Sequence, residues 1–192
     1  MLLFKISYWI GMIAELIIRI PFAISIKSQI VLQKTNDKRE NMLLGLLSLT
    51  MLPPLVYSVS NRLTSFDYAL PDWMGWLGLG ILLISVLIFW RSHYDLKNNW
   101  SATLAIYKEQ KLITKGIYKF IRHPMYLSQF LSSIAQILIL QNWMAGPIRL
   151  LFFLPFYLLR KNNEERVLEA RFGQQYLNYK EQTGSLFPKF IK

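Results

Sequence analysis

The stretch GIYKFIRHPMY, residues 116–126, is a polar and basic segment between two long apolar parts of the chain. It contains His123, one of only two histidines, and Pro124 directly after it. A second polar cluster, RKNNEE at residues 160–165, follows about forty residues later. Both clusters adjoin apolar runs of membrane length, so together they indicate a site at a membrane surface.

The composition around these clusters is that of a membrane protein. Of the 192 residues, 53% are hydrophobic and 15% aromatic, which is more apolar surface than a soluble domain of this size needs. The formal charge of +11 is interpreted as a basic cytoplasmic face beside anionic lipid, in preference to a nucleic-acid surface. No Cys is present, which excludes disulfides and thiolate catalysis, and with two His we predict no metal site.

Apolar runs define the fold class that we predict, an all-α polytopic integral membrane protein with about five transmembrane helices. The pair Pro53-Pro54 is expected to kink the second run, and the last two runs are expected to form a tight helical hairpin. No cleavable leader stands apart at the beginning, so the first run is expected to be a retained helix. The five runs cover residues 6–32, 42–59, 73–90, 125–140 and 143–159.

We predict a single membrane domain over residues 1–192, with three spans in residues 1–90 and a cofactor-binding catalytic part in residues 91–192. The connection at residues 91–124 has no membrane span and is too long for a plain loop, so it is expected to be functional. In the tail after residue 160, apolar side chains at helical spacing predict one amphipathic helix that carries Leu168, Phe172, Tyr176 and Tyr179.

Lys and Arg residues predict the topology. Residues 33–41, 91–124 and 160–192 together carry 17 of them, whereas the segments expected on the other side carry only Lys5 and Arg62. By the positive-inside rule, both polar clusters and the cofactor pocket should face the cytoplasm.

Two features of the membrane runs leave alternatives open. Glu15 and Arg19 lie four residues apart in the first run, so they can form a buried ion pair or serve a ligand, and Pro21 can break the helix. Arg122, His123 and Pro124 precede the fourth run, where a helix start favours an anionic or polar ligand group. The alternative is a helix-start turn with Arg122 reaching to the interface.

Arg160 and Glu164 lie one helical turn apart at the end of the last run. In isolation this spacing is equally typical of a surface ion pair, which contributes little to stability.

Taken in order, these motifs resemble those of the isoprenylcysteine carboxyl methyltransferase family, whose broader relatives are the membrane phospholipid methyltransferases. The resemblance covers roughly residues 90–190. It rests on QKLITKGIY at 110–118, RHPMY at 122–126, the Glu pair at 164–165 and the later Leu168, Phe172, Gly173, Tyr176 and Tyr179. NNWS at 98–101 fits prokaryotic members. Ser128 departs from the pattern, since a Gly often stands at that place.

The resemblance implies the cofactor S-adenosyl-L-methionine in a cytosolic pocket formed by the 91–124 connection and the C-terminal helix. It also implies a lipophilic methyl acceptor that enters from the bilayer, most simply an isoprenylcysteine-like carboxylate. Arg160 would be the catalytic residue facing the acceptor, and Glu164 would hold a polar end of the cofactor. The other cofactor-binding residues implied are Gln110, Lys111, Leu112, Ile113, Tyr118, His123, Pro124, Met125 and Tyr126.

Three other functions remain open at this point. The same architecture can methylate the nitrogen of a phospholipid amine or the sulfur of a small thiol. A membrane reductase of the sterol type shares an Arg-His motif but has a longer chain with more spans. A non-enzymatic transporter or scaffold would not need the order of Arg160 and Glu164. No pattern identifies the oligomeric state.

Overall fold

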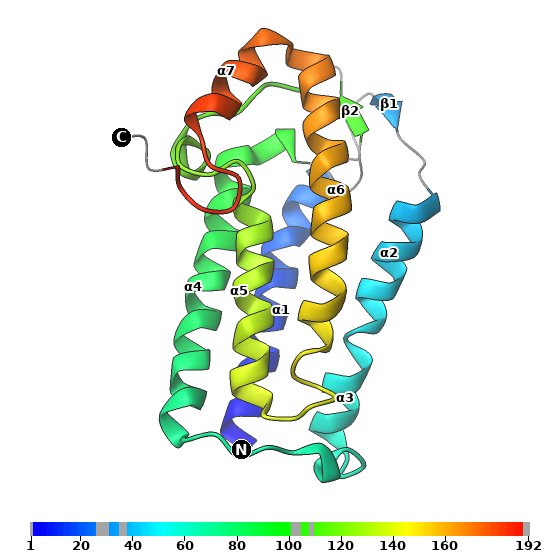
Figure 1. Ribbon diagram of the computed structural model, residues 1–192, viewed down its shortest axis with the longest axis vertical. Coiled ribbons are helices and arrows are strands. Elements are labelled where there is room, and N and C mark those ends of the chain that lie inside the picture. The colour runs from blue at the N-terminus through cyan, green and yellow to red at the C-terminus, as the bar shows by residue number, and fades with distance from the viewer. Residues whose placement is uncertain (1, 26–30, 35–37, 101–104, 108–109, 190–192) are drawn as a thin grey trace.

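The computed structural model describes residues 2–25, 31–34, 38–100, 105–107 and 110–189. Most of them belong to helices that run along the long axis of the molecule (Figure 1). The α-helices are α1 (Leu2–Ser25), α2 (Lys38–Leu49), α3 (Leu52–Val59), α4 (Asp72–Leu96), α5 (Pro124–Leu140), α6 (Ile148–Phe172) and α7 (Gln174–Gln182).

Two short strands join this helical bundle, and the sequence did not predict them. β1 (Val31–Lys34) pairs antiparallel with β2 (Ala105–Tyr107), so that Val31 lies opposite Tyr107 and Lys34 opposite Ala105. The first apolar run is predicted as one helix to residue 32, but the structure has a helix over Leu2–Ser25 and a strand that begins at Val31, and residues 26–30 lie outside the described residues. Strands this short carry no alternating pattern, and their pairing depends on a distant segment.

The second predicted run forms two helices, α2 and α3, with a break at Thr50 and Met51. Pro53 and Pro54 occupy the first positions of α3, where the missing N–H groups need no partner. The Thr50 hydroxyl donates to the Leu47 carbonyl at 2.6 Å and so satisfies one carbonyl at the end of α2. The kink predicted at the proline pair is present in a stronger form, as an interruption between α2 and α3.

Small residues bring α4 and α5 into close contact. A Cβ atom on Gly78 would meet side-chain atoms of Leu138 and Ile139 at 2.9 Å, so only glycine permits this separation. Two helical turns further along α4, the Ser85 hydroxyl donates to the carbonyl of Ser128 at 2.9 Å. Ser128, where the motif family often has Gly, is thus fully buried at a close crossing, as small residues in membrane helices often are.

The predicted hairpin of the last two runs is present as α5 and α6, joined by residues 141–147. Gln141 ends α5 in the left-handed conformation with φ 48°. The Asn142 side chain then accepts the N–H groups of Met144 and Ala145 and donates to Asp67, which holds the turn in place. α6 begins at Ile148, later than predicted.

The tail differs from its prediction. α6 continues through the polar cluster to Phe172, and Gly173 at φ 53° then separates it from α7. The single amphipathic helix predicted from Leu168 to Tyr179 is therefore wrong. A left-handed residue changes the chain direction, and glycine adopts this conformation without a Cβ penalty.

Three helical segments are long and apolar enough to cross a membrane: α1, the α2–α3 segment over Asn41–Val59, and α4. Large apolar side chains on these helices are exposed, as lipid contact requires, among them Ile13, Ile17, Leu83 and Leu87. The protein is therefore an integral membrane protein. α5 is shorter, with 17 residues, so five spans remain a prediction for the α5–α6 hairpin.

The two ends of the bundle differ in content. α7, β1, β2 and the described parts of the 91–124 connection gather at one end, and the N-terminus lies at the other (Figure 1). The segments that the charge count assigned to one membrane side therefore lie together.

Candidate active site

A cavity of about 290 Å³ lies at the end of the bundle where the connection and the tail meet. Its walls come from α1, α2, α4, α5, α6 and α7 and from the 91–124 connection. All eleven site residues predicted from the sequence line it: Gln110, Lys111, Leu112, Ile113, Tyr118, His123, Pro124, Met125, Tyr126, Arg160 and Glu164. Segments separated by up to fifty residues in the sequence are thus brought together.

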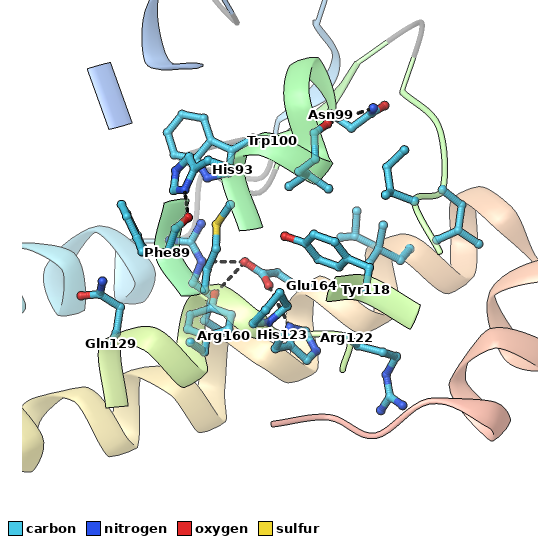
Figure 2. A pocket seen from close by; sticks show the side chains of 18 of the residues that line it. Phe89, His93, Asn99, Trp100, Tyr118, Arg122, His123, Gln129, Arg160 and Glu164 are labelled. Atoms are coloured by element: carbon cyan, nitrogen blue, oxygen red, sulfur yellow. Dashed lines mark hydrogen bonds and ion pairs between the residues drawn. The ribbon is translucent and has the colours of Figure 1, made fainter. Parts of the chain in front are cut away.

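The Glu164 carboxylate is the centre of this cavity's polar wall. Its Oε1 accepts the Tyr126 hydroxyl at 2.7 Å and Nε of Arg160 at 2.9 Å. Its Oε2 lies 3.7 Å from Nδ1 of His123. Figure 2 shows Glu164 between Arg160 and His123, with these contacts dashed. The Arg160 side chain is 8% exposed and that of Glu164 24%, so this is a largely buried pair whose carboxylate still reaches the cavity.

The neighbouring Glu165 points to the other side and holds the tail. Its Oε1 lies 3.0 Å from Nη2 of Arg122 and 3.2 Å from Nε2 of His123, and its Oε2 lies 3.0 Å from Nζ of Lys180. Burial alone would raise the pKa of Glu165, but the hydrogen bonds from His123, Lys180 and Arg122 together hold that pKa well below its usual value. Glu165 is therefore a charged anchor between α5, α6 and α7.

Arg122 strengthens this anchor by donating to backbone carbonyls of the tail. Its Nη1 donates to the carbonyl of Lys180 at 3.0 Å and also to that of Thr183. Its own N–H donates to the Gly184 carbonyl at 2.8 Å, and Ile121 forms a parallel bridge with Gly184. The interfacial, lipid-reaching interpretation of Arg122 is wrong, because its guanidinium is buried and bound. The start of α5 is the place where the sequence favours an anionic or polar ligand group. In the structure, the carboxylates of Glu164 and Glu165 lie beside it.

Three tethers position the connection over the cavity. The Asp95 carboxylate at the end of α4 accepts the Ile117 N–H at 2.8 Å, and Gly116, at φ 64°, leaves room for it, since a Cβ there would collide with Asp95. The Lys111 N–H donates to Oδ1 of Asn99 at 2.6 Å. These bonds fix the backbone within residues 110–113, at Lys111, and shortly after them, at Ile117.

Tyr118 provides the third tether and lies inside the protein. Its carbonyl accepts the Tyr179 hydroxyl at 2.6 Å, which connects the connection to α7. Its own hydroxyl donates to the Ser92 carbonyl at 3.4 Å, and burial raises its pKa well above the usual value. Tyr118 is therefore neutral across the physiological range and acts as a hydrogen-bonding wall of the cavity.

Other side chains of the cavity were not predicted as site residues. Trp100 and Asn99 belong to the NNWS segment, for which the resemblance implies no role in the site. Leu168, Tyr176 and Tyr179 were assigned only to the tail's apolar face. The other lining residues carry no local signal of a site. Six of them lie in the apolar runs, Leu44, Leu47, Phe89, Gln129, Phe153 and Phe156, and two lie outside the runs, Leu96 and Val167.

His93 is a further lining residue with an unusual environment. Its Nδ1 lies 3.0 Å from the Phe89 carbonyl, which makes Nδ1 the donor and leaves Nε2 as an acceptor. Nε2 is buried and has no hydrogen-bond partner in the part of the chain that the structure describes. Rings of Phe89, Phe22 and Trp100 surround it.

The two charged residues of α1 are separated by the fold. Glu15 is buried and lies 3.5 Å from Arg149 of α6, and it also accepts Nε2 of Gln129 and the Ser85 hydroxyl, each at 3.2 Å. The possible pair of Glu15 with Arg19 is therefore absent. Arg19 lines the cavity instead, with its guanidinium 5.1 Å from the ring centroid of Trp100.

Comparison with known proteins finds similarity to one class, the membrane methyltransferases. The model of the isoprenylcysteine carboxyl methyltransferase family matches residues 76–170, just under half of the chain, which contain most of α4, all of α5, most of α6 and all eleven predicted site residues. This match confirms, over these residues, the resemblance that the motif order predicted.

Two relatives and one solved structure show which known proteins the chain is similar to. The chain is 30% identical over 118 residues to a protein-S-isoprenylcysteine O-methyltransferase of Tribolium castaneum, covering 60% of this chain and 42% of the relative. It is 28% identical over 138 residues to a methanethiol S-methyltransferase of Pseudomonas deceptionensis, covering 69% and 49%. The chain thus spans less than half of each relative.

The solved structure is that of the eukaryotic intramembrane Ras methyltransferase ICMT. It superposes with a TM-score of 0.53 at 22% identity, covering 82% of this chain and 54% of that one. At this identity the match establishes a shared fold.

Proposed function

We propose that this protein is a membrane methyltransferase that uses S-adenosyl-L-methionine to methylate the carboxylate of an isoprenylcysteine-like lipophilic acceptor. One observation carries the proposal: all eleven residues that the family motif assigns to the site line a single cavity at the polar end of the bundle. A transporter or scaffold gives no reason for this convergence.

The cavity's side chains suit the proposed cofactor. Apolar groups such as Leu112, Ile113 and Val167 offer surfaces for a flat base, and the Glu164 carboxylate offers an acceptor for an ammonium group. Cationic side chains of the lining complement a carboxylate. Gln110, Lys111, Leu112, Ile113 and Tyr118 would hold the adenosyl part, with residues 123–126 and Glu164 around the remainder.

When bound, the cofactor supplies a methyl group on a positively charged sulfur, and transfer is an in-line displacement. A carboxylate acceptor is already deprotonated near neutral pH, so the protein needs no general base. Its task is to align the acceptor and to exclude water. Arg160, held in orientation by Glu164 and stacked over Phe156 with 5.5 Å between its guanidinium carbon and the ring centroid, is placed to orient such a carboxylate.

A lipophilic acceptor has an apolar approach to this site. Leu44 and Leu47 of α2 and Phe153 and Phe156 of α6 line the cavity on the side of the membrane helices. An isoprenoid chain can lie along these side chains while its polar end reaches Arg160. This arrangement favours an acceptor that arrives from the bilayer.

Methylation of a small thiol is the second candidate, and the Pseudomonas relative favours it because that protein is named a methanethiol S-methyltransferase. A phospholipid amine is a further alternative acceptor for the same architecture. A thiol must lose its proton, so transfer to it would rise with pH where transfer to a carboxylate would not.

The decisive experiment uses the purified protein in detergent or lipid nanodiscs with methyl-labelled S-adenosyl-L-methionine. A panel of N-acetyl-farnesylcysteine, phosphatidylethanolamine and methanethiol is offered, and the labelled product is extracted. We expect base-labile label on farnesylcysteine. Label only on the thiol or the amine would replace the carboxylate assignment, and no label together with no saturable cofactor binding would refute the methyltransferase assignment.

We further propose that the cavity faces the cytoplasm and that five helices span the membrane. The chain contains no Cys, so single cysteines report topology without background. Lys115→Cys lies on the exposed connection and Arg62→Cys at the opposite end of the bundle, and both positions are exposed. An impermeant thiol reagent should label position 115 only from the cytoplasmic side and position 62 only from the other, and the reverse pattern would refute this orientation.

A further inference from the structure

Arg19 is the charged residue of the cavity that the proposed mechanism does not use. It lies in the last two turns of α1 and lines the cavity beside Trp100. A guanidinium inside a membrane helix is costly unless it has a role or an anionic partner. Glu15, the nearby carboxylate on α1, is occupied by Arg149, Gln129 and Ser85.

The charges of the lining are unbalanced. Among the described residues, four cationic side chains line the cavity, Arg19, Lys111, Arg122 and Arg160, against one carboxylate, that of Glu164. Arg122 is neutralised from behind by Glu165, and Arg160 is paired with Glu164. Arg19 forms no ion pair with a carboxylate among the described residues. The Arg160 guanidinium lines the same cavity, so like charges from α1 and α6 face one space.

Two repelling guanidinium groups on one cavity form a site that an anion would stabilise. Arg19 comes from α1 and Arg160 from α6, so a carboxylate bound by both would be contacted from two different helices. Guanidinium groups bind carboxylates through paired, charge-assisted hydrogen bonds. The contact with the buried Trp100 ring limits the positions of the Arg19 head group and reduces the entropy lost on binding.

We propose that Arg19 binds a carboxylate of the ligand in the cavity that Arg160 also lines. This inference rests on the proposed function, since it concerns the ligands of that site. Two ligands offer such a group, the methyl acceptor and the amino-acid end of the cofactor. The chemistry is the same for both, and the experiment separates them.

The test compares Arg19→Gln and Arg19→Lys with Arg62→Gln, a matched removal of positive charge at the opposite end of the bundle. The cofactor arm measures binding of S-adenosylhomocysteine and of 5′-methylthioadenosine, which lacks the amino-acid end, by calorimetry. The acceptor arm measures KM for N-acetyl-farnesylcysteine. Arg19 is exposed rather than packed in the core, and Arg19→Lys keeps the charge, so at least one variant should retain the fold.

If Arg19 holds the cofactor carboxylate, Arg19→Gln weakens S-adenosylhomocysteine binding by about 10- to 100-fold and leaves methylthioadenosine binding unchanged. If it holds the acceptor carboxylate, KM for the farnesylcysteine rises by a similar factor and both nucleosides bind as before. Arg19→Lys should lose less in either arm. Unchanged binding and unchanged KM in a wild-type protein that binds cofactor and transfers methyl would overturn the inference, whereas a wild-type protein without either property refutes the proposed function itself.

Discussion

Two Arg–Glu pairs in this protein have the same chemistry and different surroundings. In the membrane interior, Arg149 and Glu15 are 6% and 7% exposed and lie 3.5 Å apart, with Gln129, Ser85 and Ser132 around them. At the polar end, Arg160 and Glu164 lie 2.9 Å apart, and Glu164 keeps 24% exposure toward the cavity. Protein groups surround the first pair, whereas the second pair borders space for a ligand. The residue types alone do not distinguish a structural pair from a functional one.

The interior pair should have the largest effect on stability. Arg149→Met leaves Glu15 buried without its cation, which we expect to cost about 3–5 kcal/mol of unfolding free energy. The double variant Glu15→Gln/Arg149→Met removes both charges and should recover most of that loss. Unfolding in mixed detergent measures both. A loss in the single variant of only a few tenths of a kcal/mol would mean that the interior network does not hold the bundle together.

Glu165 extends the comparison to a buried carboxylate outside the membrane. Glu165→Gln should lower stability by about 3 kcal/mol at neutral pH, because three donors lose a charged partner. The folded-state pKa of Glu165 lies below its unfolded value of 4.5, so its stabilisation is complete above pH 4.5 and is lost as pH falls below it.

The matching measurement is the pH dependence of unfolding below pH 4.5. The wild type should lose stability in this range more steeply than Glu165→Gln. Equal slopes for the two proteins would show that Glu165 is not the anchor described above.

The cavity pair should act on binding more than on stability. Glu164→Gln should weaken S-adenosylhomocysteine binding by about 10- to 100-fold, because an acceptor with full negative charge is lost. Glu169→Gln is the control, since Glu169 lies on the same helix and pairs with Lys180 outside the cavity. Calorimetry on folded protein separates the two variants, and equal affinities for both would mean that Glu164 is a structural residue like Glu15.

The smallest effect is expected for Arg160→Lys. A lysine keeps the charge but cannot hold a carboxylate through two parallel hydrogen bonds, so kcat/KM for a carboxylate acceptor should fall by about tenfold. Cofactor affinity should change little. Full turnover in this variant would show that the guanidinium fork of Arg160 does not orient the acceptor and would favour a thiol or amine acceptor.

Features encoded locally were predicted well. The motif at 110–126, with Arg160 and Glu164, predicted eleven residues that line the cavity, and the long apolar runs predicted the positions of α1, α4 and α5. The proline pair correctly marked the break between α2 and α3. These signals depend on neighbouring residues, which a sequence displays directly.

Features decided by distant contacts were missed. Glu15 has Arg19 at helical spacing, yet its partners Gln129 and Arg149 come more than a hundred residues later. The end of α6 was misplaced because residues 160–172 change from apolar to polar without any helix-breaking residue before Gly173. The pairing of β1 with β2 likewise depends on a segment about seventy residues away.

The order of the cavity's residues along the chain has a consequence for biosynthesis. Its walls extend from Arg19 to Tyr179, and Gly184 and Ser185 fasten the tail to the backbone of Arg122 and His123. A ribosome delivers these last contacts long after α1 has entered the membrane. The earlier helices must therefore remain associated without the final wall, and the close, small-residue crossing of α4 and α5 can provide that association. A nascent chain that stops before residue 179 would have membrane helices but would lack the Tyr179 wall of the ligand site.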